Sequence, residues 1–244
     1  MTHALDNPVW HALRGPHRGF AAGHGLALHY PREVAVFSAM ADANEQAFAD
    51  LARGLPPDTE ARLVRARAEP LPDGWALMND VPLLQMEARS FDGQQREGPP
   101  IVTLGPQDRE AMMALVELTQ PGPFGPRTLE MGHYIGVFEH GRLLAMAGER
   151  MRLDAHVELS AICTHPSARG RGLAEGLMRR LMHDALQRGQ QPFLHVLPAN
   201  AGAIALYRRL GFVVRTEMHY RWCQPVMPKA HAASANATAS APAG

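Results

Sequence analysis

Between residues 157 and 197 the apolar positions follow a strand period, then a helix period, then a strand period again. Residues 157–164 (VELSAICT) alternate, with Glu158, Ser160, Ile162 and Thr164 on the more polar face, which predicts a strand. The next apolar positions recur at three- and four-residue steps, so residues 171–188 are predicted to form a helix that ends at Gly189. Residues 193–197 (FLHVL) are a second run of strand length. This order predicts an α/β fold.

The flanking segments extend the pattern. Asn200 is a favourable N-cap, and residues 200–210 are predicted to form a helix that ends at Gly211. Residues 212–222 are expected to begin a closing pair of strands. Upstream we expect a strand at 101–104, a helix at 106–118, a rigid loop at 119–128 and a hairpin over 134–150.

The chain is expected to divide at Gly98-Pro99-Pro100. Residues 1–100 hold one helix pattern near 39–55 and short apolar runs separated by prolines, which predicts a smaller accessory α/β lobe. Residues 101–224 form the second predicted domain. Residues 225–244 are rich in Ala, Ser and Pro and are expected to be a disordered tail.

Composition indicates a soluble cytoplasmic protein. The chain has 244 residues, 46% of them hydrophobic, and 24 Lys and Arg balance 24 Asp and Glu, so we expect no nucleic-acid partner. It has no apolar run of membrane-spanning length and no secretory signal, so we expect no membrane partner. The two cysteines lie on separate predicted strands. The histidines lack metal-ligand spacing, so no metal is expected.

A glycine-rich turn enters the helix at 171–188. It reads Arg169-Gly170-Arg171-Gly172-Leu173-Ala174, and such a turn leaves several backbone N–H groups unpaired at the positive end of the helix dipole. These features predict a phosphate-bearing ligand. A Walker loop is excluded because the only lysine is Lys229, and a dinucleotide fingerprint is disfavoured because Glu175 stands where its third glycine would be.

Two motifs in order resemble the GNAT superfamily of N-acetyltransferases. Arg169-x-x-Gly172-x-Ala174 resembles the family's Arg/Gln-x-x-Gly-x-Gly/Ala loop, and residues 200–212 (NAGAIALYRRLGF) resemble its Asn-x-x-Ala-x-x-Leu-Tyr-x-x-x-Gly-Phe motif. The resemblance covers about residues 101–224. It implies a mixed, mostly antiparallel sheet with a splayed central strand pair flanked by helices. The first 100 residues resemble the worn acetyltransferase lobe of glycine N-acyltransferase relatives, although a plain accessory lobe explains them as well.

The resemblance also implies the ligand and its contacts. Acetyl-CoA would be the cosubstrate, with its pyrophosphate on the loop amides and its pantetheine arm along the strand at 157–164. The cofactor-binding residues implied in this way are Ile162, Cys163, Thr164, Arg169, Gly170, Arg171, Gly172, Leu173, Ala174 and Asn200.

Acetyl transfer to an amine needs a base for the amine, an N–H donor for the oxyanion and an acid for the thiolate. The resemblance implies that Tyr207 is the acid. Glu158 stands where several relatives carry a glutamate base, while a solvated strand-end carboxylate is the alternative. His156 and His195 are second-choice bases. Cys163 is interpreted as a packing residue, because direct transfer needs no nucleophile.

The acceptor is expected to bind at the loop near residues 121–128, where Phe124, Arg127 and Glu130 are the candidate residues. Arg127 would suit a carboxylate-bearing acceptor such as an amino acid. The function predicted is acyl-CoA-dependent N-acetyl transfer to a small amine or amino acid, by a monomer or homodimer. A non-catalytic coenzyme A-binding regulatory module is the alternative.

Overall fold

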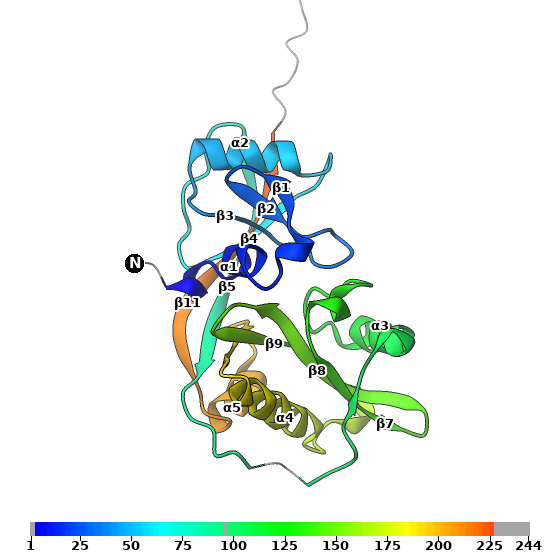
Figure 1. Ribbon diagram of the computed structural model, residues 1–244. Helices are drawn as coiled ribbons and strands as arrows, with labels where there is room; N and C mark the ends of the chain where they lie inside the picture. The colour runs from blue at the N-terminus through cyan, green and yellow to red at the C-terminus, as the bar shows by residue number, and fades with distance from the viewer. Residues whose placement is uncertain (1–2, 95–96, 227–244) are drawn as a thin grey trace, which may run out of the picture.

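The computed structural model describes residues 3–94 and 97–226, and its centre is one twisted sheet (Figure 1). In the described residues this sheet has eight strands in the order β4-β11-β5-β10-β9-β8-β7-β6. The strands are β4 (Ala61–Arg65), β5 (Trp75–Ala88), β6 (Val102–Thr103), β7 (Tyr134–Glu139), β8 (Arg142–Arg152), β9 (His156–Thr164), β10 (Gln191–Val196) and β11 (Phe212–Pro225). Neighbours are antiparallel except β9 and β10, which are parallel. The mixed, mostly antiparallel sheet of the sequence prediction is confirmed.

Helices cover both faces of this sheet. They are α1 (Pro8–Arg14), α2 (Glu45–Gly54), α3 (Arg109–Thr119), α4 (Leu173–Gln187) and α5 (Ala201–Arg209). α4 and α5 pack against one face, in a cluster that includes Leu159 and Leu194. α3 packs against the opposite face, in a cluster that includes Ala161 and Cys163.

α4 follows directly from its sequence pattern. Its buried residues are Leu173, Leu177, Met178, Leu181, Met182 and Ala185, the stripe predicted from their spacing. Each fully buried Leu or Met contributes about 1.5–3 kcal/mol to folding. Gly189, at φ +71°, follows the end of the helix in the left-handed conformation that glycine tolerates best.

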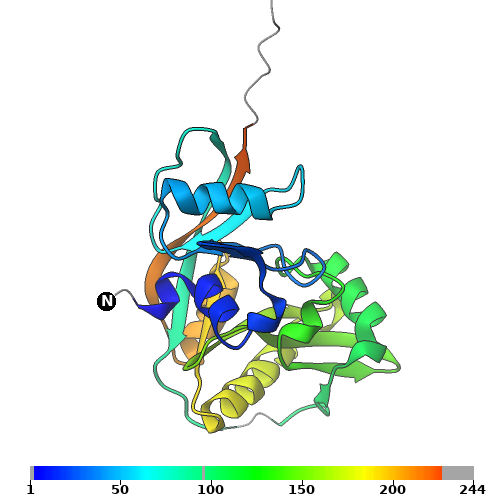
Figure 2. The same cartoon turned by 45° about the horizontal axis from the view of Figure 1, so that its top comes forward.

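The N-terminal half is joined to the sheet instead of standing beside it. A small sheet of β1 (Ala22–His24), β2 (Ala27–His29) and β3 (Ser38–Met40) lies with α1 and α2. Its core side chains, such as Leu13 and Phe37, share one cluster with Phe193 and Met218 of the large sheet. Figures 1 and 2 show this half against the sheet on the side away from α4.

β5 comes from the first 100 residues but lies between β10 and β11. Its register with β11 runs from Ala88 opposite Phe212 to Trp75 opposite Pro225. The expected closing pair of strands after residue 212 is therefore wrong: β11 is one long strand, and its partners β5 and β4 precede it in the chain. The sheet also crosses the boundary expected at residues 98–100. The expected tail lies outside the described residues from 227 onward.

Candidate active site

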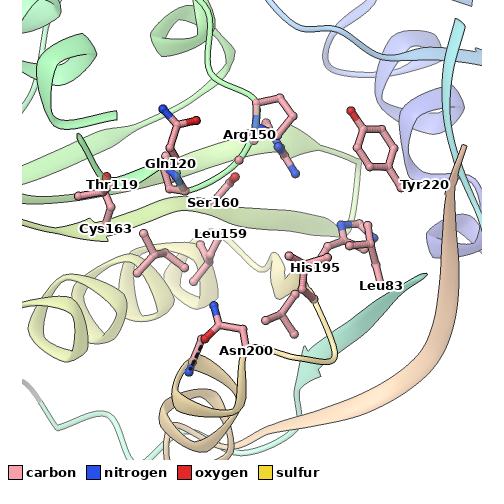
Figure 3. Close-up of a pocket in the computed structure, with 18 of the residues that line it drawn as sticks. Leu83, Thr119, Gln120, Arg150, Leu159, Ser160, Cys163, His195, Asn200 and Tyr220 are labelled. Carbon is pink, nitrogen blue, oxygen red and sulfur yellow. Dashed lines mark hydrogen bonds between the residues drawn. The ribbon is translucent and has the colours of Figure 1, made fainter. Parts of the chain in front are cut away.

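A cavity of about 560 Å³ lies where β9 and β10 separate (Figure 3). The two strands pair from Gln191 opposite His156 to Phe193 opposite Glu158, and then diverge. Asn200, the N-cap of α5, lies at one end of the view, and Arg150 and Tyr220 lie at the other. The lining residues are Phe37, Val64, Val81, Leu83, Thr119, Gln120, Pro121, Gly122, Pro123, Arg150, Leu159, Ser160, Ala161, Ile162, Cys163, Thr164, Arg169, His195, Val196, Leu197, Asn200, Ala203, Tyr207, Tyr220 and Trp222.

A β-bulge in β9 forms one wall of this cavity. Between the Met146–Cys163 and Gly148–Ser160 pairs, β9 has two residues, Ala161 and Ile162, opposite the single residue Ala147 of β8. Ala161 adopts φ +52°, an uncommon conformation for a residue other than glycine. A bulge leaves a backbone group of the longer strand outside the regular ladder. The regular ladder of backbone hydrogen bonds is thus interrupted where the two strands separate.

The bulge also corrects the expected strand faces. Strict alternation predicts Leu159, Ala161 and Cys163 on one face, but Leu159 belongs to the α4 cluster while Ala161 and Cys163 belong to the α3 cluster. Ile162, expected on the polar face, packs against the α4 cluster. The extra residue shifts every later side chain to the other face.

The glycine-rich turn enters α4 through two glycines in the left-handed conformation. Gly170 and Gly172 have φ +76° and +74°, and Gly172 is the N-cap of α4. Arg169 lines the cavity, whereas Arg171 points to Glu139 and donates two hydrogen bonds to it, at 2.8 and 3.1 Å. The Leu173 side chain is buried in the α4 cluster. Asn200 lines the cavity while its Oδ1 accepts the Ala203 N–H at 3.2 Å.

Tyr207 reaches the cavity from α5. Its side chain is buried in the α4 cluster, and burial raises the pKa of Tyr207 to about 12. Among the described residues, no side chain or backbone group hydrogen-bonds to its hydroxyl. The phenol is consequently protonated at neutral pH and has a proton to donate. Burial likewise raises the pKa of Cys163, so this residue is a thiol packed in the core.

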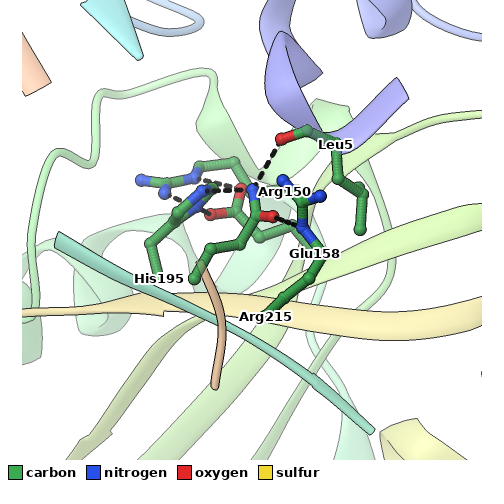
Figure 4. Close-up of polar contacts among 6 residues, drawn as sticks. Leu5, Arg150, Glu158, His195 and Arg215 are labelled. Carbon is green, nitrogen blue, oxygen red and sulfur yellow. Dashed lines mark hydrogen bonds and ion pairs between the residues drawn. The ribbon is translucent and has the colours of Figure 1, made fainter. Parts of the chain in front are cut away.

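Glu158 is buried beneath the cavity in an ion-paired cluster (Figure 4). Arg150 donates two hydrogen bonds to its carboxylate, at 2.9 and 2.7 Å, and His195 Nδ1 lies 2.8 Å from Oε1. Burial alone would raise the pKa of Glu158, but the Arg150 charge and these hydrogen bonds hold it well below its usual range. Glu158 is therefore an ionised carboxylate with both oxygens engaged, not the solvated strand-end group that was the alternative.

Gln85 of β5 fixes the other side of the His195 ring. Its Nε2 lies 2.8 Å from Leu5 O and 3.0 Å from His195 Nε2, and its Oε1 accepts a hydrogen bond from Arg215. Because this amide nitrogen can only donate, His195 Nε2 accepts, and the ring proton is on Nδ1, directed at Glu158. His195 is thus held as one neutral tautomer at the cavity wall.

The structure does not bring the expected acceptor residues to the cavity, although Pro121–Pro123 of the same loop line it. Phe124 packs its ring edge-on against Tyr134, with centroids 5.7 Å apart. Arg127 is exposed and pairs with Glu130 at 2.8 Å and with Glu33 at 3.2 Å. These contacts hold the Arg127 guanidinium at the loop surface, outside the cavity lining.

His156 also lies away from the cavity lining. Its ring packs edge-on against His3, with centroids 5.6 Å apart, and its Nε2 is 4.0 Å from Glu87. Conversely, sequence reasoning missed Arg150, Phe37 and Tyr220, which do line the cavity. No local motif marks these three residues, because they come from β8, from the loop before β3 and from β11, which are far apart in the sequence.

The described part of the chain contains neither a metal-binding cluster nor a membrane-spanning helix. Over residues 3–94 and 97–226, no three His, Cys, Asp or Glu side chains are grouped so that they could hold a metal ion. None of the helices in these same residues combines the length and apolar character needed to cross a membrane.

Known proteins share this architecture and parts of this sequence. Residues 134–223 match the family described as FR47-like protein. An acetyltransferase of the GNAT family from Novosphingobium aromaticivorans has 38% sequence identity, covers 93% of this chain and 100% of its own, and superposes with a TM-score of 0.84. A GCN5-related N-acetyltransferase from Kribbella flavida, at 19% identity, covers 90% of this chain and 95% of its own with a TM-score of 0.60, and so shares the fold.

A shorter match concerns sequence alone. Over 83 residues the chain is 36% identical to the N-alpha-acetyltransferase RimI of Mycobacterium tuberculosis. The match covers 33% of this chain and 51% of RimI, so it spans about half the length of that relative.

Proposed function

Since the chain belongs to the GNAT family of acetyltransferases, we propose that it transfers an acetyl group from acetyl-CoA directly to the nitrogen of an amine. The observation that carries this proposal is the cavity between the diverging strands β9 and β10, which extends from Arg169, beside the start of α4, to Arg150 and His195. This cavity offers one space in which a thioester and an amine could meet.

The proposed acetyl-CoA contacts follow from the elements along this cavity. The backbone N–H groups at the first turn of α4 would bind the pyrophosphate, aided by the helix dipole. The backbone of Ile162–Thr164 would pair with the pantetheine arm as an added strand does with a sheet edge. Asn200 would stay an N-cap while its side chain borders the arm.

The bulge and Tyr207 supply two of the three groups that the reaction needs. As the amine nitrogen bonds to the thioester carbonyl carbon, the N–H groups at Ala161 and Ile162 would stabilise the negative charge that develops on oxygen. When the carbon–sulfur bond breaks, the electron pair stays on sulfur. Tyr207 would then donate its proton to the thiolate.

The third group must take the proton from the amine. Glu158, the base expected from the sequence, has both oxygens hydrogen-bonded and does not line the cavity. We therefore propose that Glu158 acts through His195: the ring would accept the proton at Nε2, and the carboxylate would stabilise the resulting imidazolium across Nδ1. Gln85 would have to release Nε2 for this step.

A binding and turnover experiment tests the function. Acetyl-CoA should raise the melting temperature of the wild-type chain by linkage, and free thiol should appear when a suitable amine is added. Gly172→Glu puts a side chain and a negative charge at the left-handed N-cap of α4, so it should abolish both signals.

Gly189→Glu is the matched control. It makes the same change at a glycine of similar φ (+71°) with open space around it, at the opposite end of α4. An acetyl-CoA shift that persists in Gly172→Glu would contradict the loop assignment. Binding without thiol release, over a broad set of amines, would favour the non-catalytic coenzyme A-binding alternative.

A further inference from the structure

The charges around the cavity restrict which amines can enter it. Among the described residues that line the cavity there is no Asp or Glu, and the only permanently charged side chains are Arg150 and Arg169. Arg169 belongs to the turn before α4, which the proposed function gives to the cosubstrate phosphates. Arg150 is therefore the permanent charge at the acceptor end.

Arg150 keeps an unused donor. Its Nε and Nη2 donate to Glu158, whereas its Nη1 has no hydrogen-bond partner among the described residues. Nη1 is also absent from the described atoms that are both buried and unpartnered, so it is accessible, and Arg150 lines the cavity. The side chain is only 10% exposed. Its guanidinium carbon lies 4.9 Å from the centroid of Phe37, which holds the group in place.

A guanidinium held in this way is complementary to an oxygen anion. Hydrogen bonds from arginine to carboxylates are about twice as strong as those between neutral groups. Glu158 is fully buried, does not line the cavity and is already paired with Arg150 and His195, so it is not available to bind an ammonium group of the acceptor. Ser160 lies on the same strand, next to the bulge, and adds a hydroxyl to this end of the cavity.

Apart from the polar loop residues Thr119 and Gln120, the remaining walls at this end are largely apolar. They come from the N-terminal half, from the loop after α3 and from β11, and they include Phe37, Val64, Val81, Leu83, Pro121 and Tyr220. An apolar side chain gains about 25 cal/mol for each Å² that it buries against such walls. A polycation would find no carboxylate to replace its lost hydration.

We infer that the acceptor is a free α-amino acid with an apolar side chain, whose carboxylate binds Arg150 Nη1 and whose side chain lies against these walls. The inference rests on the proposed function and narrows its substrate. A simple amine, a polyamine and a peptide N-terminus are the alternatives that the experiment must separate.

Matched acceptors test this without altering the protein. The specificity constant kcat/KM is measured from thiol release and is calculated on the concentration of unprotonated amine. The acceptors compared are leucine with 3-methylbutylamine and phenylalanine with 2-phenylethylamine, where each amine is the amino acid without its carboxylate. In leucinamide and in the dipeptide Leu-Gly the leucine α-carboxylate is replaced by a neutral amide, which keeps a carbonyl oxygen but has no negative charge. Spermidine represents the polycations. We expect each amino acid to exceed its decarboxylated and uncharged analogues by at least about tenfold, the value of one charge-assisted hydrogen bond.

Variants then assign the preference to Arg150. Arg150→Lys keeps a cation beside Glu158 but removes the second donor group, so the preference for leucine over 3-methylbutylamine should fall toward one, mainly through KM for leucine. Arg127→Lys makes the same change at an exposed arginine outside the cavity and should keep the preference. If Arg150→Lys does not fold, the wild-type comparison still decides the question.

The outcomes separate this inference from the proposed function. Thiol release with amines but no preference for a carboxylate would overturn the inference and leave the proposed function standing. Better turnover of Leu-Gly or spermidine than of leucine would overturn it in the same way. If acetyl-CoA neither shifts the melting temperature nor releases thiol with any acceptor, the proposed function itself fails.

Discussion

Tyr207 is a single side chain whose environment favours one protonation state. Burial raises the pKa of Tyr207 to about 12, and its ring packs against Phe212 with centroids 6.2 Å apart. Tyr207→Phe preserves this packing and removes only the proton. Turnover should fall by roughly ten- to a thousandfold, while the acetyl-CoA dissociation constant and the melting temperature stay near wild type. Wild-type turnover in the variant would mean that Tyr207 packs in the core and is not the acid.

Because Glu158 is buried and ion-paired, substituting it should affect stability more than substituting an exposed carboxylate. Its folded pKa is lowered, so its contribution to stability is present above its unfolded pKa, about 4.3, and is lost as the pH falls below that value. Glu158→Gln leaves Arg150 buried without its counter-ion and should cost about 3–5 kcal/mol at pH 7. When the free energy of unfolding is measured with urea at several pH values, the wild type should lose this contribution at acid pH. The variant should not show that part of the loss, because it has no carboxylate to protonate.

A surface variant controls for general charge effects. Glu130→Gln removes an exposed partner of Arg127 and should change stability much less. An equally small effect in Glu158→Gln would contradict the buried ion pair.

The proton route can be tested on the same residue. If Glu158 supports His195 as the base, the rate of folded Glu158→Gln should recover as the pH rises, because more of the amine arrives neutral. The measurement is the pH–rate profile with saturating acetyl-CoA, for Glu158→Gln and wild type. Identical profiles would mean that the proton leaves by another route.

At the scale of elements, the bulge in β9 depends on a residue in the left-handed region. Ala161 has φ +52°, which costs roughly 1–2 kcal/mol for a residue other than glycine. Ala161→Gly should therefore keep or raise the free energy of unfolding, whereas Ala161→Val should lower it, because a branched side chain is strained there. Urea unfolding of both variants measures this. Equal stabilities would mean that the backbone at 161 is not left-handed in solution.

At the scale of the molecule, the first 100 residues complete the sheet. Without β5, both β10 and β11 lose a partner strand, and the cavity loses walls such as Val81 and Leu83. Residues 101–226 alone should therefore show no cooperative thermal transition and no acetyl-CoA shift. Adding residues 1–100 as a separate chain should restore both, because the break falls between β5 and β6. A cooperative transition in the isolated fragment would contradict a single folding unit.

Local patterns predicted the elements that depend on near neighbours. The spacing of apolar residues predicted α4, and the motif with Asn200 and Gly211 predicted α5. The expected hairpin over 134–150 is confirmed by the antiparallel pairing of β7 and β8. Helix periodicity, caps and tight turns involve residues a few positions apart, so the sequence contains these signals in adjacent letters.

The tertiary structure decided what depends on distant partners. The pairing of β5 with β11 joins residues more than a hundred positions apart, and periodicity does not say which strands pair. Because of the bulge at Ala161, the β9 side chains from this residue onward lie on the opposite sheet face from the one that regular alternation predicts. The sequence marked Glu158 as a candidate base and gave no signal for Arg150, and only the tertiary structure showed that both are buried beside His195 in one ion-paired cluster. Charge and burial at a site are set by its neighbours in space, which chain order leaves open.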